Sequence, residues 1–114
     1  MATIKYDSST YTGDVQNGVA NGRGKLVWDE GQVYEGDFVN GRYHGNGKLS
    51  GSDGTVYTGD FMNGEMHGWG KYSTPTGNVY VGDFANGKMH GRGRLTSPDG
   101  KSFDVNYVDG QLVK

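Results

Sequence analysis

The chain has 114 residues, a formal net charge of −2 and no cysteine, which together exclude several classes of protein. Its length is that of one domain, its weak charge offers no basic surface for nucleic acid, and disulfides and thiolate–metal sites are ruled out. No apolar stretch approaches the ~18 residues of a membrane span, and the chain does not start like a signal peptide. We therefore expect a cytoplasmic protein, with membrane association left open.

From its eleventh residue the chain repeats one pattern with a period of 23 residues. Each unit reads Tyr-x-Gly-Asp-(Phe/Val)-x-Asn-Gly and continues with (His/Asn)-Gly-x-Gly-(Lys/Arg)-(Leu/Tyr). Such self-similarity is the signature of a repeat architecture. We expect one domain over residues 1–114, with four repeats starting near 11, 34, 57 and 80 and half-repeat caps at 1–10 and 101–114.

Two turn signals alternate along the repeat and divide each unit into two strands. One is Asn-Gly, typical of a two-residue type I′ hairpin turn, at Asn17-Gly18, Asn40-Gly41, Asn63-Gly64 and Asn86-Gly87, with Asp109-Gly110 at the end. The other is a three-residue loop that ends in a left-handed glycine, such as Ser52-Asp53-Gly54. We therefore expect about eleven short strands and no substantial helix.

The strand register is predicted by treating the Asn40-Gly41 hairpin as an uninterrupted ladder. The predicted pairs are Phe38 with Tyr43, Gly36 with Gly45, and Tyr34 with Gly47. Because side chains alternate between the two faces of a sheet, each tyrosine ring lies across a glycine and covers the backbone that it exposes. The expected core is three ladders: Tyr11, Tyr34, Tyr57, Tyr80 and Phe103; Val15, Phe38, Phe61, Phe84 and Tyr107; Leu26, Leu49, Tyr72 and Leu95.

The repeat resembles the MORN repeat (membrane occupation and recognition nexus), whose pattern Tyr-x-Gly-x-(Phe/Trp)-x-x-Gly…His-Gly-x-Gly is matched from Tyr34 to Gly47 and in the other units. The first unit departs from it at Ser8, Val15 and Asn21, as an N-terminal cap would. The resemblance implies an all-β protein, a MORN-type β-solenoid in which stacked 23-residue β-hairpins form one elongated, twisted antiparallel sheet. It also implies adaptor and assembly roles, end-to-end self-association, and lipid binding like that attributed to junctophilins and plant phosphatidylinositol phosphate kinases.

Three histidines at one position of successive units suggest a metal site, but their spacing argues against it. His44, His67 and His90 lie two strands apart, roughly 9.6 Å at about 4.8 Å per strand, whereas zinc ligands approach to about 2.1 Å. The predicted register instead pairs these histidines with Asp37, Asp60 and Asp83 as stabilising cross-strand partners. We expect no metal site and no cofactor.

Catalytic constellations find little support in the repeat. No serine holds a repeated place beside the His and Asp positions, and alternating strands offer no nucleophile elbow or oxyanion hole. A phosphate-binding loop needs glycines that open a helix, whereas these glycines lie inside strands. We therefore expect no catalytic residues and no enzyme activity, which leaves an enzyme as a distant alternative.

The predicted polar face carries balanced charge. Its basic residues are Arg23, Lys25, Lys48, Lys71, Arg92 and Arg94, and its acidic residues are Asp14, Glu35, Asp37, Asp60, Asp83 and Asp104. Balanced charge gives little net attraction to an anionic membrane. Recognition of phospholipid or a membrane surface therefore remains the alternative function, resting on the family resemblance alone.

Positions that differ between units indicate where a partner binds. We expect a non-catalytic scaffold or adaptor module that holds a protein segment, a peptide or a helix, along the aromatic face, because a one-layer sheet leaves that face partly uncovered. The predicted partner-binding residues are Tyr43, Tyr57, Phe61, Met66, Tyr80 and Met89, together with Trp69. Trp69 lies on the polar face, where structural packing and binding are equally good interpretations.

The C-terminal half-unit is the predicted site of self-association. Phe103, Tyr107 and Leu112 continue the ladders, but the sequence stops before a full second strand can cover them. Pairing of that edge across a two-fold axis would give a homodimer.

Overall fold

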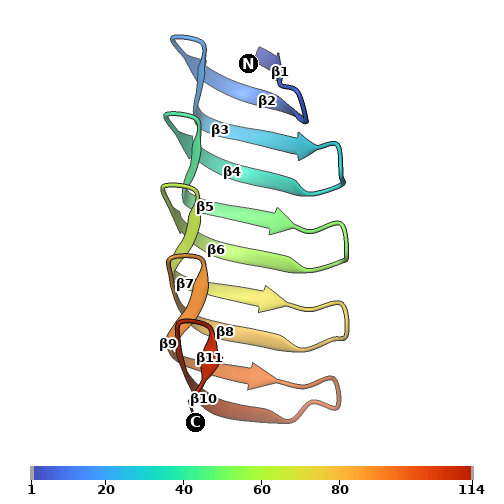
Figure 1. The fold of residues 1–114 in the computed structure, drawn as a ribbon, viewed down its shortest axis with the longest axis vertical. Coiled ribbons are helices and arrows are strands. Elements are labelled where there is room, and N and C mark those ends of the chain that lie inside the picture. The colour runs from blue at the N-terminus through green and yellow to red at the C-terminus, as the bar shows by residue number, and fades with distance from the viewer. Residues whose placement is uncertain (1, 114) are drawn as a thin grey trace.

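The computed structural model describes residues 2–113, which form one open antiparallel sheet of eleven strands in chain order (Figure 1). The strands are β1 (Ala2–Lys5), β2 (Ser9–Gln16), β3 (Val19–Trp28), β4 (Val33–Val39), β5 (Arg42–Ser50), β6 (Val56–Met62), β7 (Glu65–Ser73), β8 (Val79–Ala85), β9 (Lys88–Thr96), β10 (Ser102–Val108) and β11 (Gln111–Leu112). The sheet is elongated, at 46 × 23 × 19 Å. None of these residues lies in a helix, so none forms a helix that could cross a membrane. The all-β prediction of stacked hairpins is confirmed.

Both predicted turn types are present. Asn40 and Gly41 have φ of 51° and 81°, the positive values that a type I′ turn requires at both positions. In the other connection, the Gly51 N–H donates to the Thr55 carbonyl at 2.7 Å and closes a three-residue loop. That loop ends at Gly54 with φ of 97°, the left-handed glycine predicted there. The same two turns recur along the stack and place all Asn-Gly turns on one side (Figure 1).

The predicted register is right at the hairpin tip and wrong beyond it. Phe38 faces Tyr43, but the outer pairs are Gly36 with Gly47 and Tyr34 with Leu49. Between them, three residues of β5 lie opposite Asp37 alone, because Gly45 adopts φ of 82° and bends the strand. The bulge shifts the pairing by two residues, so every side chain keeps its predicted face.

The repeated tyrosine and aspartate hold this bulge together. The Tyr34 hydroxyl donates to the Asp37 carbonyl at 2.8 Å, and Asp37 Oδ2 accepts the Asn46 N–H at 3.2 Å. The tyrosine ring lies so close to Gly47 that an added Cβ would stand 2.3 Å from Tyr34 Oη. The prediction that the tyrosines cover glycines is therefore confirmed, although Gly47 lies diagonal to Tyr34.

The core is a continuous stack of aromatic rings. Tyr11, Tyr34, Tyr57 and Tyr80 are at most 2% exposed. Each packs edge-on against an aromatic ring of the following unit, as Tyr34 does against Phe61, with ring centroids 5.1 Å apart. The end members Val15 and Phe103 are 38% and 55% exposed, so placing them in the core was wrong. Within residues 2–113, no aromatic ring of a further unit covers either of them, unlike the middle members of the ladders.

Candidate functional site: an aromatic groove

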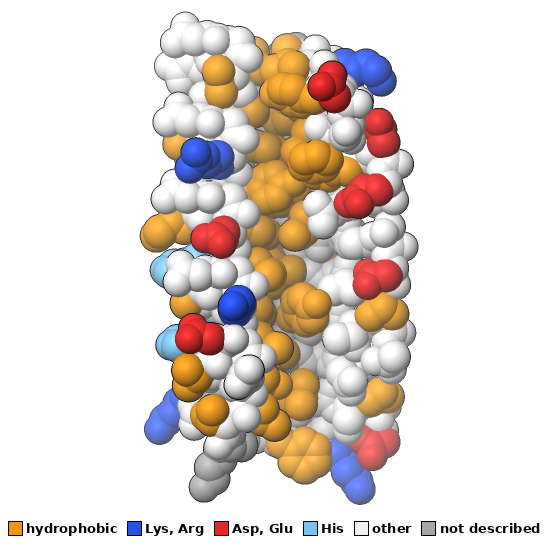
Figure 2. All heavy atoms as spheres, viewed as in Figure 1, with side chains coloured by type: hydrophobic (Ala, Val, Ile, Leu, Met, Phe, Trp, Pro, Cys, Tyr) orange, Lys and Arg blue, Asp and Glu red, His pale blue; other side chains and the backbone are white. Residues whose placement is uncertain are grey.

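The aromatic face of the sheet forms an open groove along the long axis. Figure 2 shows a band of apolar side chains running the length of the molecule, bordered on both sides by polar ones. The floor is the buried tyrosine and phenylalanine stack. Above it lie Tyr43, Met66 and Met89, which are half-buried and occupy one position in successive units. We call this surface the aromatic groove.

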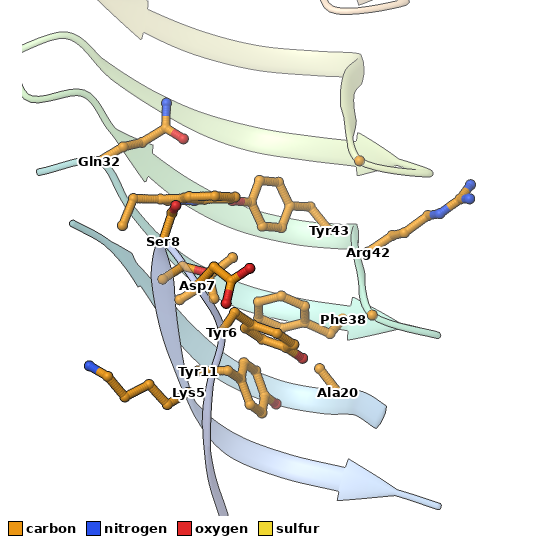
Figure 3. Close-up of a pocket in the computed structure, with 15 residues that line it drawn as sticks. Lys5, Tyr6, Asp7, Ser8, Tyr11, Ala20, Gln32, Phe38, Arg42 and Tyr43 are labelled. Atoms are coloured by element: carbon orange, nitrogen blue, oxygen red, sulfur yellow. The ribbon is translucent and has the colours of Figure 1, made fainter. Parts of the chain in front are cut away.

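The N-terminal end of the aromatic groove is a hollow of about 950 Å³ (Figure 3). It arises because Ala20 occupies the position that holds Tyr43 in the next unit, and the smaller side chain leaves space. Tyr6, from the loop between β1 and β2, lies beside Phe38 in this space. Ala20 is the one small residue at a position that holds tyrosine or methionine in the other units. This difference is the sequence signal for the hollow, which our sequence analysis did not predict.

The walls of this hollow are held rigidly. Trp28 Nε1 donates to the Tyr43 hydroxyl at 3.1 Å. The Tyr43 ring stacks on Tyr34 with centroids 3.8 Å apart and planes 7° from parallel. Burial raises the pKa of Tyr43 and takes that of Tyr57 to about 12, so both are neutral at physiological pH. The groove therefore presents uncharged rings in fixed orientations.

The six predicted partner-binding residues of the aromatic face divide into two sets. Tyr57, Phe61 and Tyr80 are buried in the floor and shape the groove without offering a free side chain. Tyr43, Met66 and Met89 form a line above that floor and keep accessible surface. Of these six residues, the groove-lining set therefore offers the larger accessible side-chain surface to a bound molecule.

Trp69 lies apart from these residues. It is 57% exposed and points from β7 to the other side of the sheet, which we call the outer face. There it faces Asp83 across the strand pair and borders a hollow of about 830 Å³ with Arg92 and Arg94. No neighbouring unit buries Trp69, so packing does not account for its size.

The predicted self-association residues differ in exposure. Tyr107 is buried and packs edge-on against Tyr80, with ring centroids 5.4 Å apart. Phe103 and Leu112 are more than half exposed. Strand β11 has two residues and, within residues 2–113, pairs with β10 alone. Within the described residues, β11 therefore covers only Tyr107 and Val108 of β10, and pairing of this edge in a homodimer stays a prediction.

The predicted histidine–aspartate pairs are wrong, because the histidines lie in the bulge without a ladder partner and the aspartates accept a backbone N–H instead, as Asp37 does from Asn46 and Asp60 from Trp69. His44 Nδ1 instead accepts the N–H of Asn63 in the next hairpin turn at 3.4 Å. His90 does the same for Asp109 at 3.1 Å. These histidines cap the turn of the following unit and so link successive hairpins. Within residues 2–113, no three His, Asp or Glu side chains gather as a metal site.

The MORN repeat family model matches residues 11–33, 34–56, 57–79 and 80–102, which begin at the four tyrosines of the groove floor. Modules of this family are generally non-catalytic, and they occur in proteins that interact with other proteins or with membranes. A search of curated proteins found no significant match.

Proposed function

This chain belongs to the MORN-repeat family, and we propose that it is a non-catalytic adaptor that holds a segment of another protein in the aromatic groove. The observation that carries the proposal is the continuous apolar band along one face, with Tyr43, Met66 and Met89 half-exposed in a line. Contiguous apolar bands on a protein surface, bordered by polar residues, mark binding sites. Methionine adapts its shape to irregular partners, and tyrosine supplies rigid contact area.

A protein segment fits this surface better than a membrane does. The outer face carries its basic residues beside acidic ones, as in the pairs Arg23–Asp37 at 3.1 Å and Arg94–Asp104 at 3.6 Å. Such a surface has little net attraction to anionic lipid. The aromatic groove is lined by neutral rings and thioethers between two rims, a shape that an extended peptide or a helix can follow.

Site-specific photo-crosslinking tests this proposal. A benzoylphenylalanine is placed at Met66 in the groove, and the matched control carries it at Trp69 on the outer face of the same strand. We expect position 66 to crosslink to one polypeptide in cells and position 69 not to do so. Crosslinking to that polypeptide from position 69 alone would overturn the proposal. Labelling of phospholipid alone from position 66 would also overturn it, in favour of membrane recognition.

A further inference from the structure

The two rims of the aromatic groove differ in charge. One rim is formed by the Asn-Gly turns and the residues after them; its charged residues are Arg42, Glu65, Lys88 and Asp109, which balance. The other, which we call the loop rim, is formed by the longer connections on the opposite side (Figure 1). Among residues 2–113, its carboxylates are Asp7, Asp29, Glu30, Asp53 and Asp99, and its basic residues are Lys101 and the neighbouring Lys5.

The carboxylates of the loop rim are exposed and lack basic partners. None forms a salt bridge within the described part of the chain, unlike Asp37 and Asp104 on the outer face. Asp53 accepts the Thr55 N–H at 3.0 Å, and that hydrogen bond lowers the pKa of its carboxyl. Asp53 and Asp99, whose carboxyl pKa values are both lowered by hydrogen bonds, are therefore ionised at neutral pH, and no salt bridge within the described residues offsets their charge.

The negative charge is concentrated beside the N-terminal hollow. Asp29 and Glu30 follow Trp28 directly, and the three border a smaller hollow of about 490 Å³. Asp7 lines the main hollow on the same side, and Lys5 and Arg42 line that hollow as well. A cation in the smaller hollow would lie beside Asp29 and Glu30, and their attraction would extend over one Debye length, about 8 Å at physiological salt. It would also meet an indole ring that can bind its charge.

We propose that the aromatic groove selects a segment with apolar side chains on one face and Lys or Arg along the edge that faces the loop rim. The inference rests on the proposed function and specifies the chemistry of the bound segment. Apolar contact with Tyr43 and Met66 supplies the affinity, whereas the one-sided charge attracts the segment and sets which way round it lies. A segment with the opposite charge would place like charges against the rim.

Two designed peptides test this selection. Both carry the same apolar positions, and one has lysine where the other has glutamate along a single edge. In low salt we expect the lysine peptide to bind at least about tenfold tighter, with the difference shrinking as salt screens the rim. Binding is measured by fluorescence anisotropy of the labelled peptides.

A pair of double variants locates the effect. Glu30→Gln with Asp53→Asn removes two of the five negative charges of the loop rim while keeping an acceptor for the Thr55 N–H. Glu35→Gln with Asp104→Asn changes net charge equally on the outer face. We expect only the rim pair to reduce the preference for lysine. Equal effects of both pairs, or no preference in the unmodified protein, would overturn the charge selection while leaving groove binding intact. Failure of both peptides to bind, or binding that survives Met66→Glu, would overturn the proposed function as well.

Discussion

The floor of the aromatic groove and its lining differ in how much the side chains vary between units. Tyr11, Tyr34, Tyr57 and Tyr80 are identical because each ring lies against a glycine and each hydroxyl satisfies the carbonyl of a bulged aspartate. The residues that line the groove at the equivalent position are Ala20, Tyr43, Met66 and Met89, so three different residue types occur in four units. The fold therefore fixes the floor and leaves the lining free to be chosen for a partner.

The largest loss of stability is expected when the buried tyrosines of the floor ionise together. Burial raises the pKa of Tyr57 to about 12 and raises those of Tyr11, Tyr34 and Tyr80 as well, against an ordinary value of 10.0. The unfolded chain therefore loses these protons first as pH rises. The stability that depends on the neutral rings is complete below pH 10 and is lost as pH rises towards about 12.

Circular dichroism and tyrosinate absorbance, followed together through that pH range, check this expectation. We expect the sheet signal to disappear cooperatively while most of the tyrosinate absorbance appears. A sheet that stays intact after every tyrosine has ionised would show that the buried hydroxyls do not hold the floor.

The next largest effect is expected when a single methyl group is added to a glycine under the floor tyrosines. Gly47→Ala would place a Cβ 2.3 Å from Tyr34 Oη, and the ring has no free space to move into because Phe38 and Phe61 lie edge-on against it. We expect a loss of about 3 kcal/mol in the free energy of unfolding, measured by denaturant titration.

Gly51→Ala is the matched control for that substitution. Gly51 lies at the end of β5 and occupies a place that holds Trp28, Thr74 and Ser97 in the other units. An added Cβ would stand 2.9 Å from Asp53 Oδ1, but that atom is the end of an exposed side chain that can shift, so the expected loss is below about 1 kcal/mol. Equal losses for the two variants would mean that the tight contact at Gly47 is not what stabilises the floor.

Most of the fold follows from the repeat, but the bulge does not. The Asn40-Gly41 turn and the alternation of side chains predict the faces and the covering of glycines by tyrosines. A two-residue bulge preserves that alternation, so no hydrophobic pattern distinguishes Gly45 in a bulge from Gly45 in a regular ladder. The role of His44 was missed for the same reason, because the bulge carries it from Asp37 to the next turn.

The candidate site was only partly accessible to sequence reasoning. The line of Tyr43, Met66 and Met89 follows from one repeated position. The loop rim does not follow from strand faces, because residues such as Asp53 lie in connections that belong to neither face of the sheet. Only their arrangement along one side of the stack reveals a shared charge (Figure 1).

A charge introduced among the lining residues separates their role from that of the floor, because it should weaken binding more than folding. Met66→Glu places a carboxylate in the apolar groove at a half-buried site near the hairpin turn, where water can still reach it. We expect binding of the partner segment to weaken by about 2 kcal/mol or more, with little change in melting temperature. Met89→Glu should act in the same direction. Isothermal titration calorimetry and thermal melting separate the two effects, and a variant that unfolds while its remaining folded fraction binds normally would contradict this division.

The smallest effect is expected from Trp69, the largest exposed side chain on the outer face. Trp69→Ala removes an indole that is 57% exposed, while the backbone N–H of residue 69 can still donate to Asp60 Oδ2. Because little buried contact is lost, the free energy of unfolding should change by no more than about 0.5 kcal/mol. Partner affinity should also stay the same, because the groove lies across the sheet. If Trp69→Ala abolishes binding while both methionine variants bind normally, the partner occupies the outer face, and the hollow beside Arg92 and Arg94 is the binding site instead.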